Sequence, residues 1–340
     1  MKQRILITGG AGFIGSNFIR YLLSDPRFAK KIQKIVNLDK LTYSGNPQNL
    51  KDLRGDKRYS FIKGDICDKE LVFSLVRQCD IIVNFAAESH VDRSIRDPAA
   101  FVRTNVTGVQ VLLDGVRRSW PAASASRMKK KRFIQISTDE VYGSVVTGSS
   151  REDSPLEPNS PYAASKAAAD LLARSYYVTY GIPILITRST NNFGPYQYPE
   201  KIIPLFITNA LEDKTLPVYA DGSNVRDWIF VKDNCDAIAF LMEEGVTGEV
   251  YNISAGNEMK NIDLTRRILR IVKKPESLVS FVKDRPGHDK RYSLDASKLF
   301  RLGWRPRSRD SMARLQETVD WYRRNQTWWR RLKKRQEKFW

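Results

Sequence analysis

The stretch that decides the fold of this chain is Arg4-Ile5-Leu6-Ile7-Thr8-Gly9-Gly10-Ala11-Gly12-Phe13-Ile14-Gly15. Its apolar beginning predicts a short buried strand, and the apolar periodicity that continues from Phe13 to Leu23 predicts a helix. Glycines between a strand and a helix let the turn tighten and let the backbone approach a pyrophosphate, which the free N–H groups of the helix can bind. The spacing satisfies Gly-x-Gly-x-x-Gly from Gly10, and in this context it predicts a dinucleotide-binding turn rather than a merely structural one.

An acidic residue ends the second predicted strand. Asp39 follows Lys34-Ile35-Val36-Asn37-Leu38, and a carboxylate about 20 residues beyond such glycines can accept both hydroxyls of an adenosine ribose. Because negative charge there repels a 2′-phosphate, NAD is favoured over NADP, although Lys40 comes directly afterwards. Asp65 ends the third predicted strand and is expected either to reach the adenine or to make an ordinary Gly-Asp turn.

Strand and helix patterns alternate through the first half of the chain. Further strands are predicted at residues 59–63, 81–85, 133–137 and 184–187, and helices at residues 70–77, 97–118 and 163–180. This alternation predicts an α/β fold, a doubly wound parallel Rossmann sheet with a smaller α/β C-terminal substrate domain.

Turn residues become frequent after Arg188, beginning with Asn191-Asn192-Phe193-Gly194-Pro195. We therefore expect residues 1–190 to form the NAD-binding Rossmann domain, to which residues 228–255 return with a strand and a helix. Residues 191–227 and 256–340 are expected to form the second domain, with helices at residues 261–271 and 309–322.

A tyrosine and a lysine lie four residues apart in the helical run that begins at Tyr162 and leads into the helix predicted at residues 163–180. Both Tyr162 and Lys166 then project from one face. The lysine ammonium, together with a nicotinamide cation, favours phenolate, so a lowered pKa is predicted for Tyr162. Tyr59 and Lys63 have the same spacing but lie in a predicted strand, where four residues span roughly 13 Å and the groups cannot cooperate.

Thr138, Asp139 and Glu140 follow the strand predicted at residues 133–137. Two adjacent carboxyls after a strand can form an ordinary turn or surface pair, or they can serve as separate acid and base. Directly after Thr138, and together with Tyr162 and Lys166, the pair indicates an oxidation coupled to loss of water.

Composition is that of a globular protein, with 340 residues of which 41% are hydrophobic. Its apolar runs are too short for a signal peptide or for a membrane span of roughly 20 residues, so we expect a cytoplasmic protein. Cys67, Cys79 and Cys235 lack the spacing of metal ligands or of a disulfide framework. We expect no metal and inert buried thiols.

The formal net charge is +19, concentrated in residues 127–132 and in the tail from Arg323 to Trp340. Such clusters form solvated basic faces or contact nucleic acid and acidic lipid. The tail and the residues just before it also carry apolar side chains, several at helical spacing, which favours packing against the rest of the protein over a membrane role. They are Trp321, Trp328, Trp329, Leu332 and Trp340.

Over nearly its whole length the chain resembles the extended short-chain dehydrogenases/reductases, and among them the dTDP-glucose 4,6-dehydratase family. The resemblance rests on residues 8–15, 86–94, 137–143, 162–166, 199–204, 226–228 and 284–289. The first and fourth segments mark the superfamily only. Ser137-Thr-Asp-Glu-Val-Tyr-Gly143 and Asp284-Arg-Pro-Gly-His-Asp289 narrow it to the dehydratases.

The resemblance implies a lyase that acts on a nucleotide-diphosphate sugar and regenerates NAD in place. Tyr162 would take the proton of the sugar 4-hydroxyl as hydride leaves C4, with Thr138 hydrogen-bonded to that oxygen and Lys166 holding the tyrosine and the nicotinamide ribose. Glu140 would then remove the C5 proton, while Asp139, kept protonated by the charge of its neighbour, would protonate the departing 6-hydroxyl. Hydride returns to C6.

The resemblance also implies binding residues for both ligands. The expected NAD contacts are Gly9, Gly12, Phe13, Ile14, Gly15, Asp39, Lys40, Asp65, Ile66, Ala86, Asn105, Tyr162 and Lys166. The expected substrate contacts are Ser89, His90, Asn191, Lys201, Arg226, Asn261, Arg285 and His288, where the arginines offer bidentate donors to the diphosphate and either histidine could instead be structural.

Several alternatives stay open at this stage. Departures from the family pattern at Thr190, Phe193, Gln197 and Asn234 leave the nucleotide open among dTDP, UDP, CDP and GDP. An epimerase or decarboxylase shares the fold, but an epimerase needs no acid/base pair at Asp139 and Glu140. A nonenzymatic NAD-binding module that engages polyanions through its basic tail is a further alternative.

The resemblance finally implies a homodimer, in which each subunit contributes two long helices, here residues 99–118 and 163–180. The apolar positions of these helices are equally compatible with a monomer.

Overall fold

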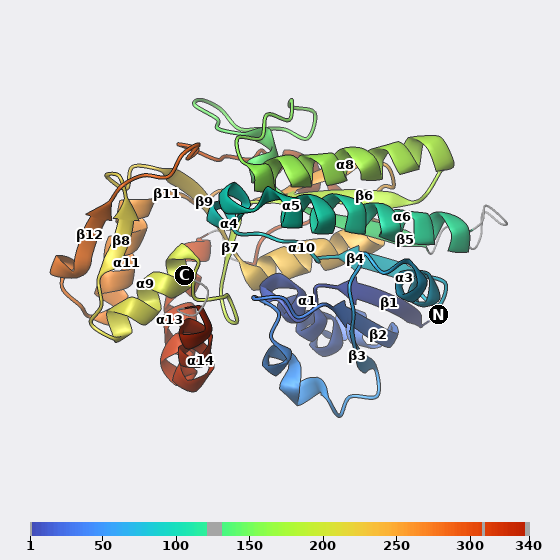
Figure 1. The fold of residues 1–340 in the computed structure, drawn as a ribbon, viewed down its shortest axis with the longest axis horizontal. Coiled ribbons are helices and arrows are strands. Elements are labelled where there is room, and N and C mark those ends of the chain that lie inside the picture. Colours follow the sequence, from blue (N-terminus) through green and yellow to red (C-terminus); the bar gives the residue numbers. More distant parts are fainter. Residues whose placement is uncertain (1, 121–130, 308–309, 337–340) are drawn as a thin grey trace.

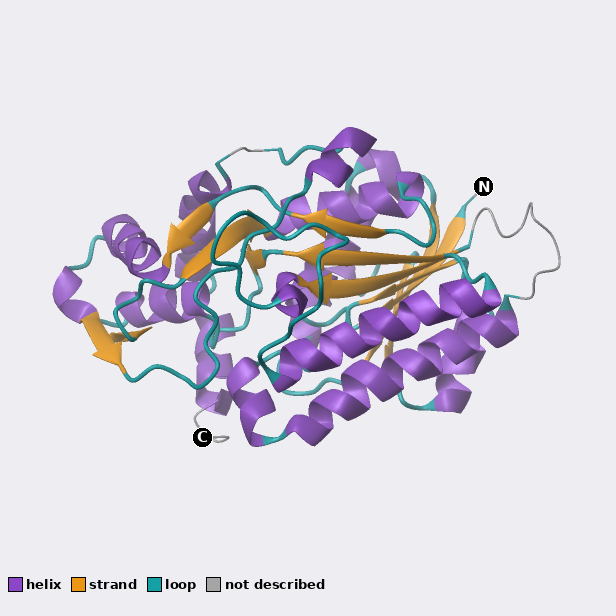
Figure 2. Cartoon of the chain, turned by 90° about the horizontal axis from the view of Figure 1, so that it is seen from above, coloured by secondary structure: helices purple, strands orange, loops and turns teal. Residues whose placement is uncertain are grey.

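The computed structural model describes residues 2–120, 131–307 and 310–336. Seven parallel strands form the central sheet in the order β10-β6-β5-β4-β1-β2-β3. Helices cover both faces of this sheet (Figures 1 and 2). The predicted α/β class with a doubly wound parallel sheet is therefore confirmed.

The strands of the central sheet agree with the predicted ones to within two residues at each end. They are β1 (Gln3–Thr8), β2 (Ile32–Asp39), β3 (Tyr59–Lys63), β4 (Ile81–Asn84), β5 (Arg132–Thr138) and β6 (Ile184–Ser189). The seventh strand, β10 (Val250–Ile253), pairs with β6 and was not indicated as a strand by the sequence pattern.

Both faces of the sheet are buried, which explains why its strands read as continuous apolar runs. Ile5 and Ile7 face one core, and Leu6 between them faces the other. The first core is closed by α1 (Phe13–Ser24) and α10 (Val231–Glu244). The second is closed by α3 (Lys69–Val76), α6 (Gly108–Ser119) and α8 (Pro161–Tyr180).

Local signals fix the ends of α8. The Ser160 hydroxyl accepts from the Ala163 N–H at 3.1 Å, Pro161 occupies the first turn, and Gly181 ends the helix with φ of 66°. Tyr162 and Lys166 therefore lie in its first two turns, on one face as predicted.

The single helix predicted at residues 97–118 is wrong in detail. After α4 (Val91–Arg96), the chain forms α5 (Pro98–Phe101), a π-helical segment η2 (Val102–Thr107) and then α6. One wide turn scarcely disturbs a helical hydrophobic pattern, so the pattern did not reveal it. The wide turn ends at Gly108, where an added Cβ would lie 2.4 Å from Cδ1 of Ile66.

A second, smaller group of elements lies to one side of the central sheet (Figure 1). It contains a sheet in the order β11-β9-β7 and a parallel pair β12-β8, with α9 (Ile202–Leu211), α11 (Asn261–Val272) and α13 (Leu315–Arg324) packed in one core. The strands are β7 (Asn191–Phe193), β8 (Leu216–Tyr219), β9 (Val225–Phe230), β11 (Glu258–Lys260) and β12 (Val279–Val282).

The strand β9 joins the two groups of elements. Trp228 and Phe230 pack in the smaller core, whereas Ile229 between them packs in the first core of the central sheet. The helix α10 that follows packs on α1, and Leu299 of α12 (Ser297–Leu302) reaches the same core. The domain boundaries proposed from the sequence stay a prediction; the packing shows several crossings between the two groups.

The remaining helical segments are short or terminal. They are α2 (Pro26–Ala29), η1 (Pro47–Leu53), η3 (Asp139–Tyr142), η4 (Glu276–Leu278), η5 (Ser311–Arg314) and α14 (Gln326–Gln336). The helix predicted at residues 309–322 thus begins as η5 and continues as α13, while residue 309 lies outside the described part.

The aromatic tail packs on the protein, as predicted. Trp329 is fully buried, Leu332 is buried, and Trp321 lies 5.0 Å from Trp328 between ring centroids. Part of its positive charge is paired, because Glu212 contacts both Arg330 and Lys333. Trp340 and residues 127–130 of the first basic cluster lie outside the described residues. No helix within the described ranges is long and apolar enough to cross a membrane.

Candidate active site

The glycine turn between β1 and α1 has the geometry of an anion cradle. Gly9 has φ of 67°, and a Cβ there would lie 2.6 Å from the Ala86 nitrogen. A Cβ on Gly15 would lie 2.5 Å from the Gly9 carbonyl oxygen. No side chain caps α1 at Gly12, so its first N–H groups face the adjoining cavity.

Asp39 fixes this turn from the end of β2. Its carboxylate accepts from the Ala11 N–H at 2.9 Å and from the Leu41 N–H at 2.8 Å. Burial raises the pKa of Asp39 despite these bonds. Lys40, which follows, pairs with Asp65 at 2.8 Å and does not neutralise Asp39 directly.

A cavity of about 290 Å³ runs along the carboxyl ends of the parallel strands. All but one of the predicted NAD contacts line it: Gly9, Gly12, Phe13, Ile14, Gly15, Asp39, Lys40, Asp65, Ile66, Ala86, Tyr162 and Lys166. Asn105 is the exception. Its buried amide instead bonds the backbone N–H and carbonyl of Glu88 and the Ser165 hydroxyl. In the chain alone Asn105 thus positions the Glu88 segment, and its contact with the cofactor stays a prediction.

A second cavity of about 250 Å³ adjoins the first. It is lined by seven of the eight predicted substrate contacts, namely His90, Asn191, Lys201, Arg226, Asn261, Arg285 and His288. Ser89 lines the first cavity, and its carbonyl accepts from the Lys201 ammonium at 2.9 Å. Glu140, Asn191, Glu200 and Lys201 line both cavities.

The acidic pair occupies the boundary between the cavities. β5 ends at Thr138, whose hydroxyl donates to Asp139 at 3.0 Å and accepts from the Glu140 N–H at 3.3 Å. Asp139 lines the first cavity and is 3% exposed, while Glu140 lines both. The second oxygen of Asp139, Oδ2, is buried without a partner.

Burial raises the proton affinity of both carboxyls, and neighbouring charges separate them. Desolvation, and then the charge of Glu140, raises the pKa of Asp139 well above its usual range. Desolvation also raises the pKa of Glu140, but Lys201, Arg285 and Arg226 act against it. Asp139 therefore holds its proton more strongly than Glu140, and the roles of acid for Asp139 and base for Glu140 stay predictions.

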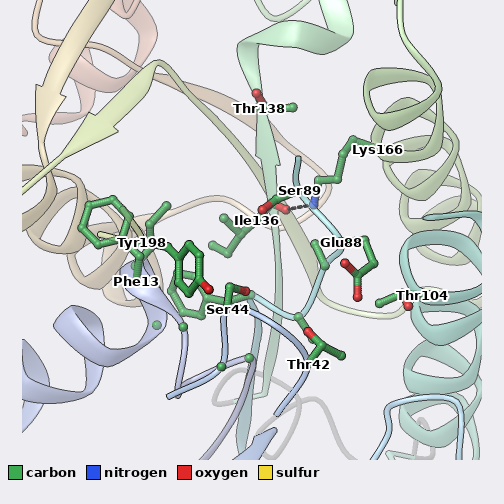
Figure 3. A pocket seen from close by; sticks show the side chains of 18 of the residues that line it. Phe13, Thr42, Ser44, Glu88, Ser89, Thr104, Ile136, Thr138, Lys166 and Tyr198 are labelled. Atoms are coloured by element: carbon green, nitrogen blue, oxygen red, sulfur yellow. Dashed lines mark hydrogen bonds between the residues drawn. The ribbon is translucent and has the colours of Figure 1, made fainter. Parts of the chain in front are cut away.

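The predicted lowering of the Tyr162 pKa involves a nicotinamide cation together with Lys166 and stays a prediction. In the chain alone, burial and then the charges of Glu140 and Asp139 raise the pKa of Tyr162. Figure 3 shows the Lys166 ammonium directed at the Ile136 carbonyl, to which it donates a hydrogen bond. Burial lowers the pKa of Lys166 to about 8.

The two histidines differ in environment. His90 is buried beside cations, and desolvation together with Lys201, Arg93 and Arg285 lowers its pKa to about 2. It is therefore neutral, and its 3.9 Å approaches to Asp92 and Glu200 are not ion pairs. His288 contacts Asp284 at 2.6 Å, and burial lowers its pKa as well.

The two predicted arginines line the second cavity and are held by different neighbours. Arg226 is 5% exposed, lies 4.3 Å from the Tyr292 ring centroid and donates to the Asp289 carbonyl at 2.9 Å. Arg285 lies 3.6 Å from Asp92, and its Nε is buried without a partner. Positive charge thus collects at the second cavity, while the paired carboxyls lie at its boundary with the first.

Several cavity residues were not predicted. Thr42, Tyr43, Ser44, Glu88, Thr104, Gln197 and Tyr198 line the first cavity, and Figure 3 shows Phe13 and Tyr198 near one another. Glu200 lies in the segment quoted for the resemblance and could have been found there. Tyr43 could not, because only the folded chain sets its ring against Arg93, 3.7 Å from the guanidinium carbon.

Among the described residues, no group of three or more His, Cys, Asp and Glu side chains is arranged to hold a metal ion. The chemistry that the site's own groups can perform is proton transfer. The groups are the two adjacent carboxyls, Asp139 and Glu140, and the phenol of Tyr162 four residues before Lys166 on α8. An extended anionic ligand would find the helix terminus in one cavity and the arginines in the other.

Comparisons with known proteins agree with this arrangement. Residues 6–315 match the family model described as GDP-mannose 4,6 dehydratase. The chain is 50% identical over 332 residues to a dTDP-glucose 4,6-dehydratase of Streptomyces niveus, covering 97% of this chain and 96% of that protein. It is 53% identical over 302 residues to the low-salt glycan biosynthesis protein Agl12 of Haloferax volcanii, covering 89% and 93%.

A solved structure is similar over the same length. DesIV, a dTDP-glucose 4,6-dehydratase of Streptomyces venezuelae crystallised with NAD bound, has a TM-score of 0.92 and 49% sequence identity, covering 97% of this chain and 99% of that chain.

The raised pKa of Asp139 predicts a pH-dependent cost in stability. An unfolded aspartate loses its proton near pH 4, whereas folded Asp139 keeps it to higher pH, so stability present below pH 4 is lost as pH rises through that window. Asp139→Asn removes this titration. We expect its melting temperature to exceed that of the unaltered chain by a few degrees at pH 8 and by less at pH 4, as measured by calorimetry.

Asp153→Asn is the matched control, because the Asp153 side chain is 78% exposed. An advantage of Asp139→Asn that is the same at both pH values would contradict the assignment of Asp139 as a protonated acid.

Proposed function

We propose that this chain, which belongs to the GDP-mannose 4,6 dehydratase family, is an NAD-dependent lyase that dehydrates dTDP-glucose to dTDP-4-keto-6-deoxyglucose. The observation that carries the proposal is the buried carboxyl pair at the boundary of the two cavities, with Asp139 facing the first and Glu140 both. The choice of dTDP-glucose as substrate rests on the relatives that are named dTDP-glucose 4,6-dehydratase.

The first cavity suits NAD. The close approach of the backbone at Gly9 and Gly15 and the uncapped terminus of α1 fit a pyrophosphate. Asp39 fits the adenosine ribose, and its negative charge would repel a 2′-phosphate. Bound NAD would supply a hydride acceptor and positive charge near Tyr162.

Tyr162 and Thr138 would serve the sugar 4-hydroxyl. Thr138 Oγ1 hydrogen-bonds that oxygen, and Tyr162 Oη accepts its proton. In the chain alone, desolvation and the nearby carboxyls hold Tyr162 as a phenol, so its activation requires the cofactor's charge in addition to Lys166. This dependence delays proton removal until both ligands are in place.

Elimination of water would then fall to the carboxyl pair. Glu140 Oε takes the proton from C5, which the adjacent 4-ketone has acidified, and Asp139 gives its proton to the leaving 6-hydroxyl. The pair begins with one proton, on Asp139, and ends with one proton, on Glu140. Arg226 and Arg285 would hold the diphosphate on the far side of the second cavity.

Incubation of the purified protein with dTDP-, UDP-, CDP- and GDP-linked glucose tests the proposal. We expect a 4-keto-6-deoxy product whose mass is lower than that of the substrate by one water, with dTDP-glucose as the preferred substrate. Chromatography with mass spectrometry detects the product. Failure with every nucleotide by folded protein containing NAD would exclude a dehydratase, and a C4 epimer without mass loss would indicate an epimerase instead.

Glu140→Gln tests the assignment of the base. Because glutamine cannot take the C5 proton, turnover should fall by about 10²–10⁴-fold while C4 oxidation persists, so reduced cofactor should accumulate in the near-ultraviolet spectrum. Glu70→Gln is the control, since Glu70 is exposed on α3. Full turnover by Glu140→Gln would show that another group is the base.

We also propose a homodimer formed through α6 and α8. Leu171 and Val178 lie two turns apart on one face of α8. Their side chains are 57% and 64% exposed, as expected of residues that a second subunit covers. Cytoplasmic location and contact of the basic tail with polyanions remain predictions from the sequence.

Changing both Leu171 and Val178 to Glu should convert a dimer into a monomer, because charged side chains would have to be buried at the interface. Sedimentation velocity measures the mass. Val146→Glu serves as the control, since Val146 is 85% exposed and lies outside both helices. A dimer that survives the double change would place the interface elsewhere.

A further inference from the structure

The C-terminal helix α14 is linked by hydrogen bonds to the glycine turn, although some 300 residues of chain separate them. Trp328 Nε1 donates to Asn49 Oδ1 at 2.9 Å, and Asn49 Nδ2 donates to the Ala11 carbonyl at 3.0 Å. In Figure 1, α14 lies beside the blue segment that includes η1, which carries Asn49. Asn49 is 1% exposed; its bond to Ala11 is buried and its bond to Trp328 is partly buried.

The Ala11 carbonyl belongs to the peptide unit whose N–H is that of Gly12. This carbonyl also accepts from the Asn46 N–H at 3.0 Å, and the Ala11 N–H is bound by Asp39. The Gly12 N–H donates back to the Gly9 carbonyl at 3.1 Å. The peptide at which α1 begins is thus held on both sides, and Asn49 is the side chain that connects it to the C-terminal helices.

A second contact joins the same helices to residues that line the cavity. The Tyr322 hydroxyl of α13 donates to the Gln197 carbonyl at 2.5 Å, and Gln197 and Tyr198 line the cavity. Tyr196, with φ of 69°, packs 4.8 Å from Trp321 and 6.1 Å from Trp328 between ring centroids. Arg20 of α1 lies 4.8 Å from the same tyrosine ring and also donates to the Asn49 carbonyl.

We propose that α13 and α14 act as a clasp that positions the glycine turn for NAD, with Trp328 acting through Asn49 as its positioning residue. This inference rests on the proposed function. A turn that is already held in its binding conformation loses less entropy when the pyrophosphate binds. For an enzyme that regenerates its cofactor in place, the clasp would prolong retention of NAD between turnovers.

Trp328→Phe tests the clasp, because it keeps an aromatic ring against Tyr196 and removes only the indole donor to Asn49. We expect the Kd for NAD, measured by calorimetry on protein freed of cofactor, to rise about five- to tenfold, with a matching rise in the dissociation rate. Asn49→Ser, which removes the bridge from the other side, should have the same effect, and the double variant should be no weaker than either single one.

Trp329→Phe is the matched control. It makes the same chemical change one residue along, where the indole donates to the Tyr322 carbonyl inside the smaller core. We expect it to lower the melting temperature and leave the Kd for NAD within twofold. Melting curves of the cofactor-free variants separate loss of fold from loss of the contact.

The outcomes distinguish the two proposals. An unaltered chain that binds no NAD would overturn the proposed function. An unaltered chain that binds NAD while Trp328→Phe and Asn49→Ser bind it equally well would overturn the clasp alone, and so would an equal loss of affinity in Trp329→Phe.

Discussion

The hydrogen bonds that pair β1 with both β2 and β4 are the constraint on which the rest of the structure depends. From β1 the chain winds outward in both directions, so the loops after β1 and β4 part and leave a crevice at the carboxyl ends of the strands. The functional groups meet in this crevice because each lies at or just after the end of a strand. They are the glycine turn, Asp39, the Ala86 segment and Thr138. Their chemistry is assembled by topology, since they lie far apart in the sequence.

Burial then sets the protonation states within the crevice. The same desolvation that keeps a proton on Asp139 also raises the pKa of Tyr162 and lowers that of Lys166. Desolvation thus favours the neutral form of the two groups that would give or take a proton, Asp139 and Tyr162. Cations from the smaller group of elements, Arg226 and Lys201 among them, bias Glu140 the other way. The acid and the base of the proposed elimination thus differ because one faces the cations more closely.

The smaller group of elements therefore contributes more than residues that line the second cavity. β9 shares its side chains between two cores, α13 contacts Gln197 of the first cavity, and α14 contacts Asn49, which bonds the Ala11 carbonyl of the glycine turn. Through the Trp328–Asn49–Ala11 chain of contacts, the clasp makes the far end of the sequence part of the predicted cofactor site. The aromatic residues that make the tail pack also explain why its basic residues are presented on a fixed helix.

The sequence by itself determined the α/β class and all but one of the strands of the central sheet, because these follow from local periodicity. Its motifs and its family resemblance also indicated contact residues of which all but Asn105 line the two cavities, although many other lining residues were not predicted. Only the tertiary structure decided what depends on neighbours distant in sequence. It bonded Asn105 to Glu88 and Ser165, surrounded Tyr162 with carboxyls that raise its pKa in the chain alone, and brought Trp328 to Asn49. Desolvation and hydrogen-bond geometry are properties of the folded interior, and no pattern of residue types along the chain specifies them.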